Sequence, residues 1–124
     1  MEGLSMYQTD QSQSIEITSE TLKNLLDYSS DEIFIFNRDK QIIYVNSACE
    51  KNYGLKKEDL LGKYSHELFE QEYWSPSIYP EVYQEKKTVC MIQTTNTGTE
   101  LLTQAIPVLN ENKEVEMVLQ PQEN

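Results

Sequence analysis

The sequence has few of the residues on which most enzymes and cofactor proteins depend. It contains one histidine, two cysteines and four glycines in 124 residues. The glycines form no phosphate-binding loop, there is no second histidine for a metal pair, and there is no G-x-S-x-G nucleophile motif. We therefore predict that the chain is not an enzyme and has neither a catalytic nor a metal site.

Basic residues are also scarce. Ten Lys and Arg residues stand against 21 Asp and Glu residues, so the formal net charge is -11. A surface this acidic repels phosphate backbones and anionic lipid headgroups, so we expect no direct nucleic-acid partner and no membrane partner. No apolar run approaches the roughly 20 residues that span a bilayer, and no signal peptide is visible. Two cysteines make a poor disulfide framework, and we therefore predict a cytoplasmic location.

The composition divides the chain into three parts. Residues 1–18 are rich in Gln, Ser, Thr and Asp and are predicted to be a flexible segment. Residues 19–119 form the predicted domain, and residues 120–124 are expected to begin a linker to an output domain.

The domain is expected to open with a helix over residues 19–29, capped by Ser19. An apolar stripe at helical spacing follows the cap, formed by Leu22, Leu25 and Leu26. Such a stripe packs on the sheet, on its counterpart in a second copy, or on both. We predict a homodimer through this helix.

Two apolar runs, 33–36 and 42–45, come next and are predicted to form a hairpin around a turn at 37–40. Short helices should follow, since Asn46 or Ser47 can cap one that ends at Gly54, and a second over 56–61 ends at Gly62. A further helix is expected to start at Ser77, with Pro80 in its first turn. Period-two alternation then predicts strands over 88–95, 100–106 and 115–119, with Pro107 at an edge or a bulge.

This order of elements resembles a PAS domain, the sensory module of many bacterial signalling proteins. The resemblance is carried by Tyr44-Val45-Asn46, Gly54, Leu60-Leu61-Gly62-Lys63, Asn96-Thr97-Gly98 and Ile106-Pro107-Val108. It implies an α+β fold in which a five-stranded antiparallel sheet, of order 2-1-5-4-3, is covered on one face by short helices. A different fold with the same kinds of elements is a small α+β enzyme or carrier of the cone-shaped type. That fold would open with several helices before its long strands, whereas here a hairpin follows the first helix.

Two turn positions depart from the family pattern. Asn37 and Lys40 stand where the family usually has Asp and Gly. Because a non-glycine residue at positive φ costs about 1 kcal/mol or more, we expect this hairpin to use a different turn type.

The resemblance, together with strand alternation, selects residues for a ligand-binding gap between sheet and helices. The inner-face candidates are Phe34, Phe36, Met91, Gln93, Thr103 and Ala105, and Tyr53 and Tyr64 add phenol groups from the helices. Gln93 carries the most information, because an amide on an apolar face needs a partner. That partner is either a small ligand, or a helix backbone group or trapped water.

Neither haem nor a covalent flavin adduct is expected as a cofactor. His66 lies in a Ser-His-Glu-Leu setting that does not match the helix of haem-binding PAS sensors. Ser65 occupies the position, three residues after Gly62, at which blue-light sensors of this type carry a reactive cysteine. Cys49 and Cys90 are expected to pack in the core, and the protein is predicted to be colourless.

The sequence therefore predicts a sensory and regulatory domain of a bacterial signalling protein. Residues 91–98 resemble PAS modules that precede sigma-N-dependent transcriptional activators, which favours a transcriptional regulator as the parent. The domain would bind a small ligand, dimerise, or both, to control its output domain. The alternative is a ligand-free PAS dimerisation module of a sensor histidine kinase.

Overall fold

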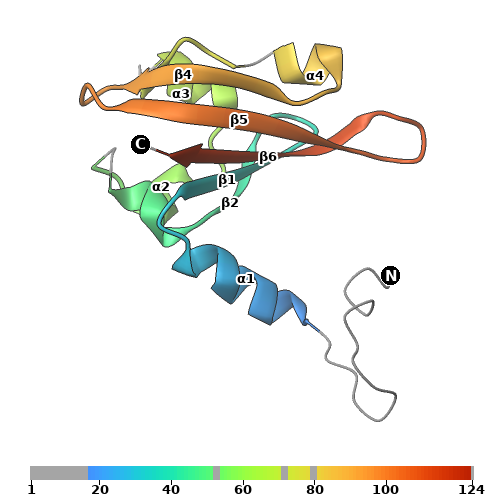
Figure 1. Cartoon of the computed structure of the whole chain (residues 1–124), viewed down its shortest axis with the longest axis horizontal. Helices are drawn as coiled ribbons and strands as arrows, with labels where there is room; N and C mark the ends of the chain where they lie inside the picture. The colour runs from blue at the N-terminus through green and yellow to red at the C-terminus, as the bar shows by residue number, and fades with distance from the viewer. Residues whose placement is uncertain (1–16, 52–53, 71–72, 79–80, 124) are drawn as a thin grey trace.

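A single antiparallel sheet carrying short helices forms the body of the molecule, and one helix projects from it (Figure 1). The computed structural model describes residues 17–51, 54–70, 73–78 and 81–123. Its elements are α1 (Ser19–Tyr28), β1 (Glu32–Asn37), β2 (Ile42–Val45), η2 (Ser47–Glu50), α2 (Lys57–Leu60), α3 (Ser65–Glu70), β3 (Trp74–Ser75), α4 (Glu81–Glu85), β4 (Val89–Thr95), β5 (Glu100–Leu109) and β6 (Val115–Glu123). No helix within those ranges is long and apolar enough to cross a membrane.

The strands lie in the order β2-β1-β6-β5-β4-β3. The five long strands therefore follow the predicted order 2-1-5-4-3, and the two-residue strand β3 adds to the β4 edge. The predicted fold class is confirmed.

The last strand is longer than predicted and reaches Glu123 rather than ending at Leu119. Residues that were assigned to a linker thus belong to the sheet, where Gln122 lies opposite both Glu32 of β1 and Thr103 of β5. Pro121, within the predicted linker, pairs with Ile33 of β1.

Pro107 lies in β5, opposite Val118 of β6. The pairing of β5 with β4 extends as far as Ala105, opposite Val89. Pro107 is thus past the last β4 pair, where its missing N–H costs no β4–β5 hydrogen bond. The predicted edge position is confirmed, and a register shift follows between Val108 and Leu109.

The core lies between the inner face of the sheet and the short helices. Alternation along β1 turns Phe34 and Phe36 inward, where both are fully buried. The Phe34 ring lies 6.3 Å from Phe36 and packs edge-on to Trp74 at 5.2 Å. The helices and the segment before α4 contribute Leu60, Leu68, Ile78 and Val82. Each such side chain contributes about 1.5–3 kcal/mol through burial, so the helices are held by packing rather than by their own length.

The helix starts differ from the sequence-based expectations. The Thr18 hydroxyl, not Ser19, caps α1 by accepting a hydrogen bond from the Thr21 amide at 3.1 Å. The next helix is a single 3₁₀ turn, η2, for which the Asn46 side chain makes no capping bond. Helix α4 begins at Glu81 rather than near Ser77; Pro80 lies outside the described residues.

Three hairpin turns share one geometry, in which a side-chain oxygen accepts from the amides two and four residues further on. The acceptors are Asn37, Thr95 and Asn110. The third residue after each acceptor has positive φ: Lys40 at 69°, Gly98 at 90° and Lys113 at 63°. The expectation of a different turn at Lys40 is therefore wrong.

Contacts with Tyr83 hold the strained turn at Lys40. The Tyr83 hydroxyl donates to the Asn37 carbonyl at 2.8 Å, and the Lys40 ammonium lies 5.3 Å from the centre of the Tyr83 ring. These contacts, added to the Asn37 side-chain bonds, offset the steric cost of the left-handed conformation.

Lys113→Gly is expected to raise the free energy of unfolding by about 0.5–1 kcal/mol, because relief of a left-handed side chain outweighs the added chain entropy of glycine. Lys40→Gly should raise the free energy of unfolding by less, because this variant also loses the contact between the Lys40 ammonium and the Tyr83 ring, worth about 0.5–1 kcal/mol. Urea unfolding of both variants measures the difference. Equal gains would show that the Tyr83 contact contributes nothing, and a loss at Lys113 would contradict the strain argument.

Candidate functional site

The structure brings most of the predicted inner-face residues together. Phe34 and Phe36 of β1, Gln93 of β4, and Thr103 and Ala105 of β5 are all buried on the face that the helices cover.

Met91 is partly buried against the same cluster. Tyr64 is more than a third exposed, and its ring lies 5.7 Å from that of His66, so it does not join the inner face. The predicted contribution of Tyr53 falls outside the described residues.

A row of buried polar side chains crosses the inner face at one level of the sheet. The Gln122 amide nitrogen donates to Gln93 Oε1 and to Thr103 Oγ1, each at 3.1 Å. The Gln93 amide nitrogen donates in turn to the Pro76 carbonyl at 2.7 Å. Both ends of the Gln93 amide thus have protein partners, and a polar ligand that uses this residue has to replace one of them.

The polar row approaches the surface where β1 begins and β6 ends. Buried Glu32 and Gln122 line a pocket of about 340 Å³ there, together with Ser30, Asp31, Ala48, Lys51 and Glu123. Sequence reasoning missed Gln122 because β6 was expected to end earlier. The alternation of residues 118–122 was the available signal, since Val118, Gln120 and Gln122 all face inward.

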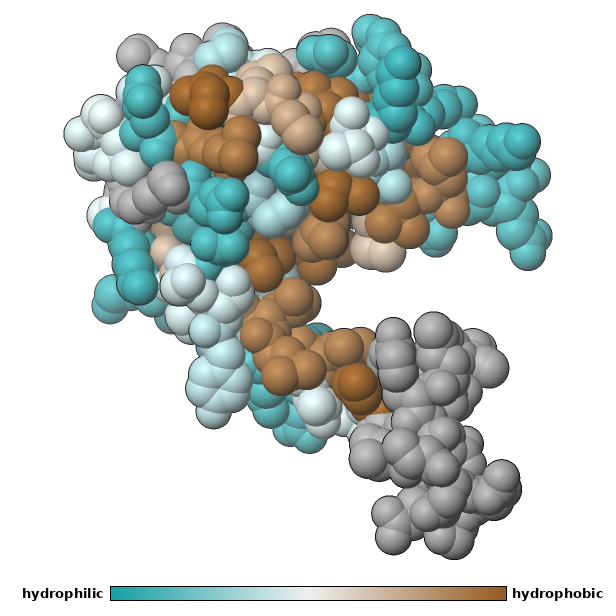
Figure 2. All heavy atoms as spheres, viewed as in Figure 1, coloured by the Kyte–Doolittle hydropathy of each residue, from teal (hydrophilic) through white to brown (hydrophobic). Residues whose placement is uncertain are grey.

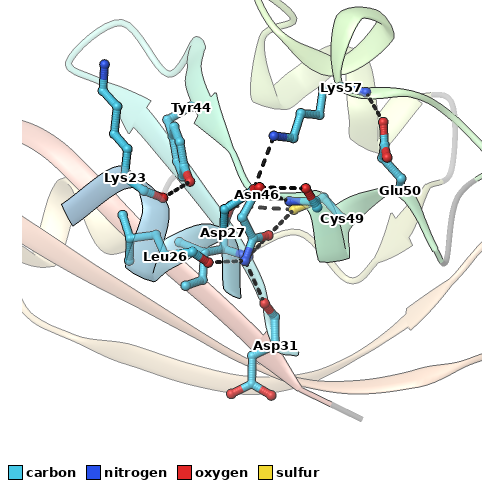
Figure 3. Close-up of polar contacts among 11 residues, drawn as sticks. Lys23, Leu26, Asp27, Asp31, Tyr44, Asn46, Cys49, Glu50 and Lys57 are labelled. Carbon is cyan, nitrogen blue, oxygen red and sulfur yellow. Dashed lines mark hydrogen bonds and ion pairs between the residues drawn. The ribbon is translucent and has the colours of Figure 1, made fainter. Parts of the chain in front are cut away.

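A second polar cluster, drawn in Figure 3, joins α1 to the domain. The buried Asn46 side chain accepts from the Ile33 amide and donates to the Leu26 and Asp31 carbonyls, all at 2.9 Å. It therefore connects the end of α1, the start of β1 and the end of β2. We call these contacts the Asn46 anchor.

Asp27 fixes the last turn of α1 to two further elements. Its carboxylate accepts from the Ser47 amide at 2.7 Å, the Ser47 hydroxyl at 2.8 Å and the Lys57 ammonium at 3.1 Å. The hydrogen bonds from Ser47, followed by that from Lys57, lower the pKa of Asp27 below its usual value of 3.8. The last turn of α1 is thus attached to both η2 and α2.

These bonds hold only one end of α1. The Tyr44 hydroxyl adds a donation to the Lys23 carbonyl at 3.4 Å, but no residue of α1 is buried. Leu25 is 54% exposed, and Leu22 is similarly open. Among the described residues, Leu22 and Leu25 of the predicted apolar stripe are therefore left uncovered, whereas Leu26 is partly buried.

The cysteines differ in environment. Cys49 is buried beside the Asn46 anchor, as predicted, and burial raises the pKa of its thiol to about 12. Cys90 is exposed, so the prediction that it packs in the core is wrong. Alternation turns Cys90 to the outer face of the sheet, which the helices do not cover.

The outer face carries large apolar side chains on β4 and β5. Ile92 and Leu102 lie opposite each other across the two strands and are 56% and 40% exposed. Cys90 and Gln104 form the neighbouring pair. We call these four residues the β4–β5 patch. Figure 2 shows hydrophobic side chains gathered over the strands and along α1 on the side turned to the viewer.

Acidification is expected to release the end of α1. The pKa of Asp27 is lowered in the folded chain. Its contribution to stability is therefore complete above the unfolded pKa of 3.8 and is lost as the pH falls through the lower pKa of the folded chain. Heteronuclear NOE values of the α1 amides between pH 6 and pH 2 should show increased motion at the acid end.

Two variants isolate this effect. Asp27→Asn should show the mobile α1 already at pH 6, whereas Glu20→Gln, an exposed carboxylate on the same helix, should behave like the wild type. An α1 that stays rigid in Asp27→Asn at pH 6 would contradict the role of Asp27.

A family model described as PAS domain matches residues 30–120. This match covers most of the chain, and the chain therefore belongs to the PAS domain family, whose members are sensory modules of signalling proteins and are usually not catalytic. No curated protein matches the chain.

Several solved structures share the fold. A PAS domain from Colwellia psychrerythraea is similar with a TM-score of 0.61 at 17% identity, covering 85% of this chain and 94% of that one. A sensory box sensor histidine kinase from Vibrio cholerae is similar with a TM-score of 0.60 at 21% identity, covering 82% of this chain and 86% of that one. The PAS domain of the fruit-fly ELK potassium channel is similar with a TM-score of 0.60 at 16% identity, covering 85% of this chain and 94% of that one. At these identities the likeness shows the fold alone.

Proposed function

We propose that this PAS domain is a cytoplasmic regulatory module of a bacterial signalling protein. It binds a small ligand at the inner face, dimerises through α1, and controls an output domain on the same full-length chain. The observation that carries the proposal is α1 itself, whose Leu22 and Leu25 are exposed while its last turn is attached to the end of β2, to η2 and to α2. A change in the short helices is thus transmitted to the dimer-forming helix.

The buried polar row supports the ligand part of the proposal. Amides and a hydroxyl on an otherwise apolar inner face offer both donors and acceptors to a small polar molecule. The pocket beside Glu32 and Gln122 gives this row a route to solvent.

For the parent protein, we propose a transcriptional regulator of the sigma-N-dependent type, because residues 91–98 resemble the PAS modules of that class. The second candidate is a ligand-free dimerisation module of a sensor histidine kinase. It is favoured by the Gln93 amide, both ends of which are bonded within the protein, and by histidine kinases among the similar structures.

Deleting residues 1–29, which removes α1, is expected to convert a dimer into a monomer in sedimentation velocity. Deleting residues 1–16 leaves α1 in place and serves as the control, which should remain a dimer. A dimer that persists without residues 1–29 would place the contact elsewhere and refute the role of α1.

A further inference from the structure

The pocket beside Glu32 and Gln122, where β1 begins and β6 ends, has a strongly acidic wall. Its volume is about 340 Å³, and three carboxylates line it together with one ammonium group, that of Lys51. We call it the β1–β6 pocket. Pockets of this size enclose small molecules, and their few charged groups decide which molecules they accept. The charge of the wall therefore indicates a positively charged occupant.

The carboxylates of the β1–β6 pocket lie at two depths. Glu32 is 3% exposed and belongs to the inner wall, whereas Asp31 is half-buried and Glu123 is exposed at the rim. A buried carboxylate is screened less by water and salt than an exposed one, so it attracts a cation more strongly. The inner wall is therefore the stronger half of the site.

The two rim carboxylates face each other without a counter-charge. Glu32 lies opposite Gln122 in the pairing of β1 with β6, and continuing that register by one residue places Asp31 opposite Glu123. Among the described residues, neither rim carboxylate takes part in an ion pair. Figure 3 shows the Asp31 carboxylate turned away from the Asn46 anchor. Like charges placed opposite each other are unfavourable, and a cation between them removes that repulsion.

The spacing of the carboxylates does not suit a single metal ion. Among the described residues, no three His, Cys, Asp or Glu side chains lie close enough together to hold one. A matching occupant therefore carries positive charge at two separated points, with a body between the inner wall and the rim. Ala48 offers an apolar surface to that body, and three carboxylates less one ammonium group leave two negative charges for the occupant to balance.

We propose that the β1–β6 pocket binds a small aliphatic diamine. One ammonium group lies at Glu32, the other lies between Asp31 and Glu123, and the methylene chain packs on Ala48. The two positive charges balance those of the pocket, and each ammonium group has three N–H donors for the carboxylates. This inference rests on the proposed small-ligand function and names the class of ligand.

Putrescine, 1,4-diaminobutane, is the probe, titrated by isothermal calorimetry into the full chain at about 150 mM salt, where exposed charges are screened. One molecule should bind per chain, with a dissociation constant of about 1 mM or lower. n-Butylamine has the same carbon chain with one ammonium group and should bind at least about tenfold more weakly. Succinate, a dianion of similar length, should not bind.

Variants that remove charge locate the site. Asp31→Asn combined with Glu123→Gln changes only the rim and should weaken putrescine binding at least about fivefold. Glu32→Gln should weaken it by about tenfold or more, because this carboxylate is buried. Lys51→Gln removes the one repelling charge and should tighten binding by about twofold. Glu116→Gln, an exposed carboxylate elsewhere on β6, is the matched control and should bind as the wild type does, within about twofold.

A map of amide shifts adds a readout that general attraction to an acidic chain would not give. In ¹⁵N–¹H spectra, putrescine should shift the amides of residues 30–32, 48, 51, 122 and 123. The turn at residues 110–114 should not respond, although it carries two glutamates. The rim variant changes side chains near the surface and keeps the fold, so it decides the matter if Glu32→Gln does not fold.

Other outcomes would overturn the inference. Shifts spread over all acidic segments, equal binding of n-butylamine, or an equal loss in Glu116→Gln would show unspecific attraction by the acidic surface. No saturation by about 10 mM putrescine would refute the diamine directly. If a metabolite from a thermal-shift screen nevertheless binds and depends on Gln93, the proposed ligand function stands and only the diamine is refuted. If no molecule binds at all, both are refuted.

Discussion

Asn46→Ala is expected to lower the free energy of unfolding by about 2–4 kcal/mol, the largest effect predicted for a single polar substitution in this chain. The variant removes the acceptor of the Ile33 amide and the donor to the Leu26 and Asp31 carbonyls. Because the site is buried, water does not replace these bonds at low cost. Urea unfolding measures the loss.

Asn24→Ala is the control for this substitution, because Asn24 is exposed on α1 and should change stability by less than about 0.5 kcal/mol. Asn46→Ala should also increase the motion of Leu26 in NMR relaxation, since that residue loses its bond to β2. An Asn46→Ala cost no greater than the Asn24→Ala cost would mean that the anchor does not hold α1 to the domain.

Gln93→Leu is expected to cost about 1–3 kcal/mol of stability. Leucine keeps the approximate volume, but the Pro76 carbonyl loses its donor and the Gln122 amide loses one of its acceptors. Gln84→Leu, on the exposed side of α4, should lie within about 0.5 kcal/mol of the wild type. A neutral Gln93→Leu would show that the polar row contributes nothing to folding.

The same variant tests the ligand proposal. A thermal-shift screen of small metabolites on the wild type comes first, and any ligand found is then titrated into Gln93→Leu. If the ligand uses Gln93, its affinity should fall by a factor of about ten or more. Unchanged affinity would assign Gln93 to structure alone and remove it from the ligand site.

Alternation together with the family resemblance made the inner face predictable from the sequence. Alternation grouped residues such as Phe34 with Phe36 on one side of a strand, and the family resemblance indicated that this side, and that of Gln93 on β4, faces inward. The order of the strands came from the resemblance to a family. Periodicity says which residues share a face, but it does not say which strands are neighbours.

Asn46 shows where sequence reasoning fails. An Asn before a short helix has the pattern of a cap, yet its side chain instead binds residues 13 to 20 positions away in the chain. Local pattern weighs only nearby partners, whereas the folded sheet brings the end of α1 and the start of β1 to the same side chain.

Lys40 shows a related failure. Its positive φ carries a local steric cost, but the fold tolerates it through Asn37 and Tyr83. Cys90 was expected in the core because free cysteine is generally buried, whereas alternation alone would have placed it outside. In both cases the surroundings that the fold supplies outweighed the general preference of the residue type.

Native mass spectrometry of freshly purified protein tests the central claim most directly, because one spectrum reports the oligomeric state and any retained small molecule. The account predicts a species at twice the chain mass, with an added small-molecule mass where ligand is retained. The variant lacking residues 1–29 should appear at the mass of a single truncated chain. A spectrum of the full chain that contains only monomer without added mass, at concentrations up to tens of micromolar, would contradict the account.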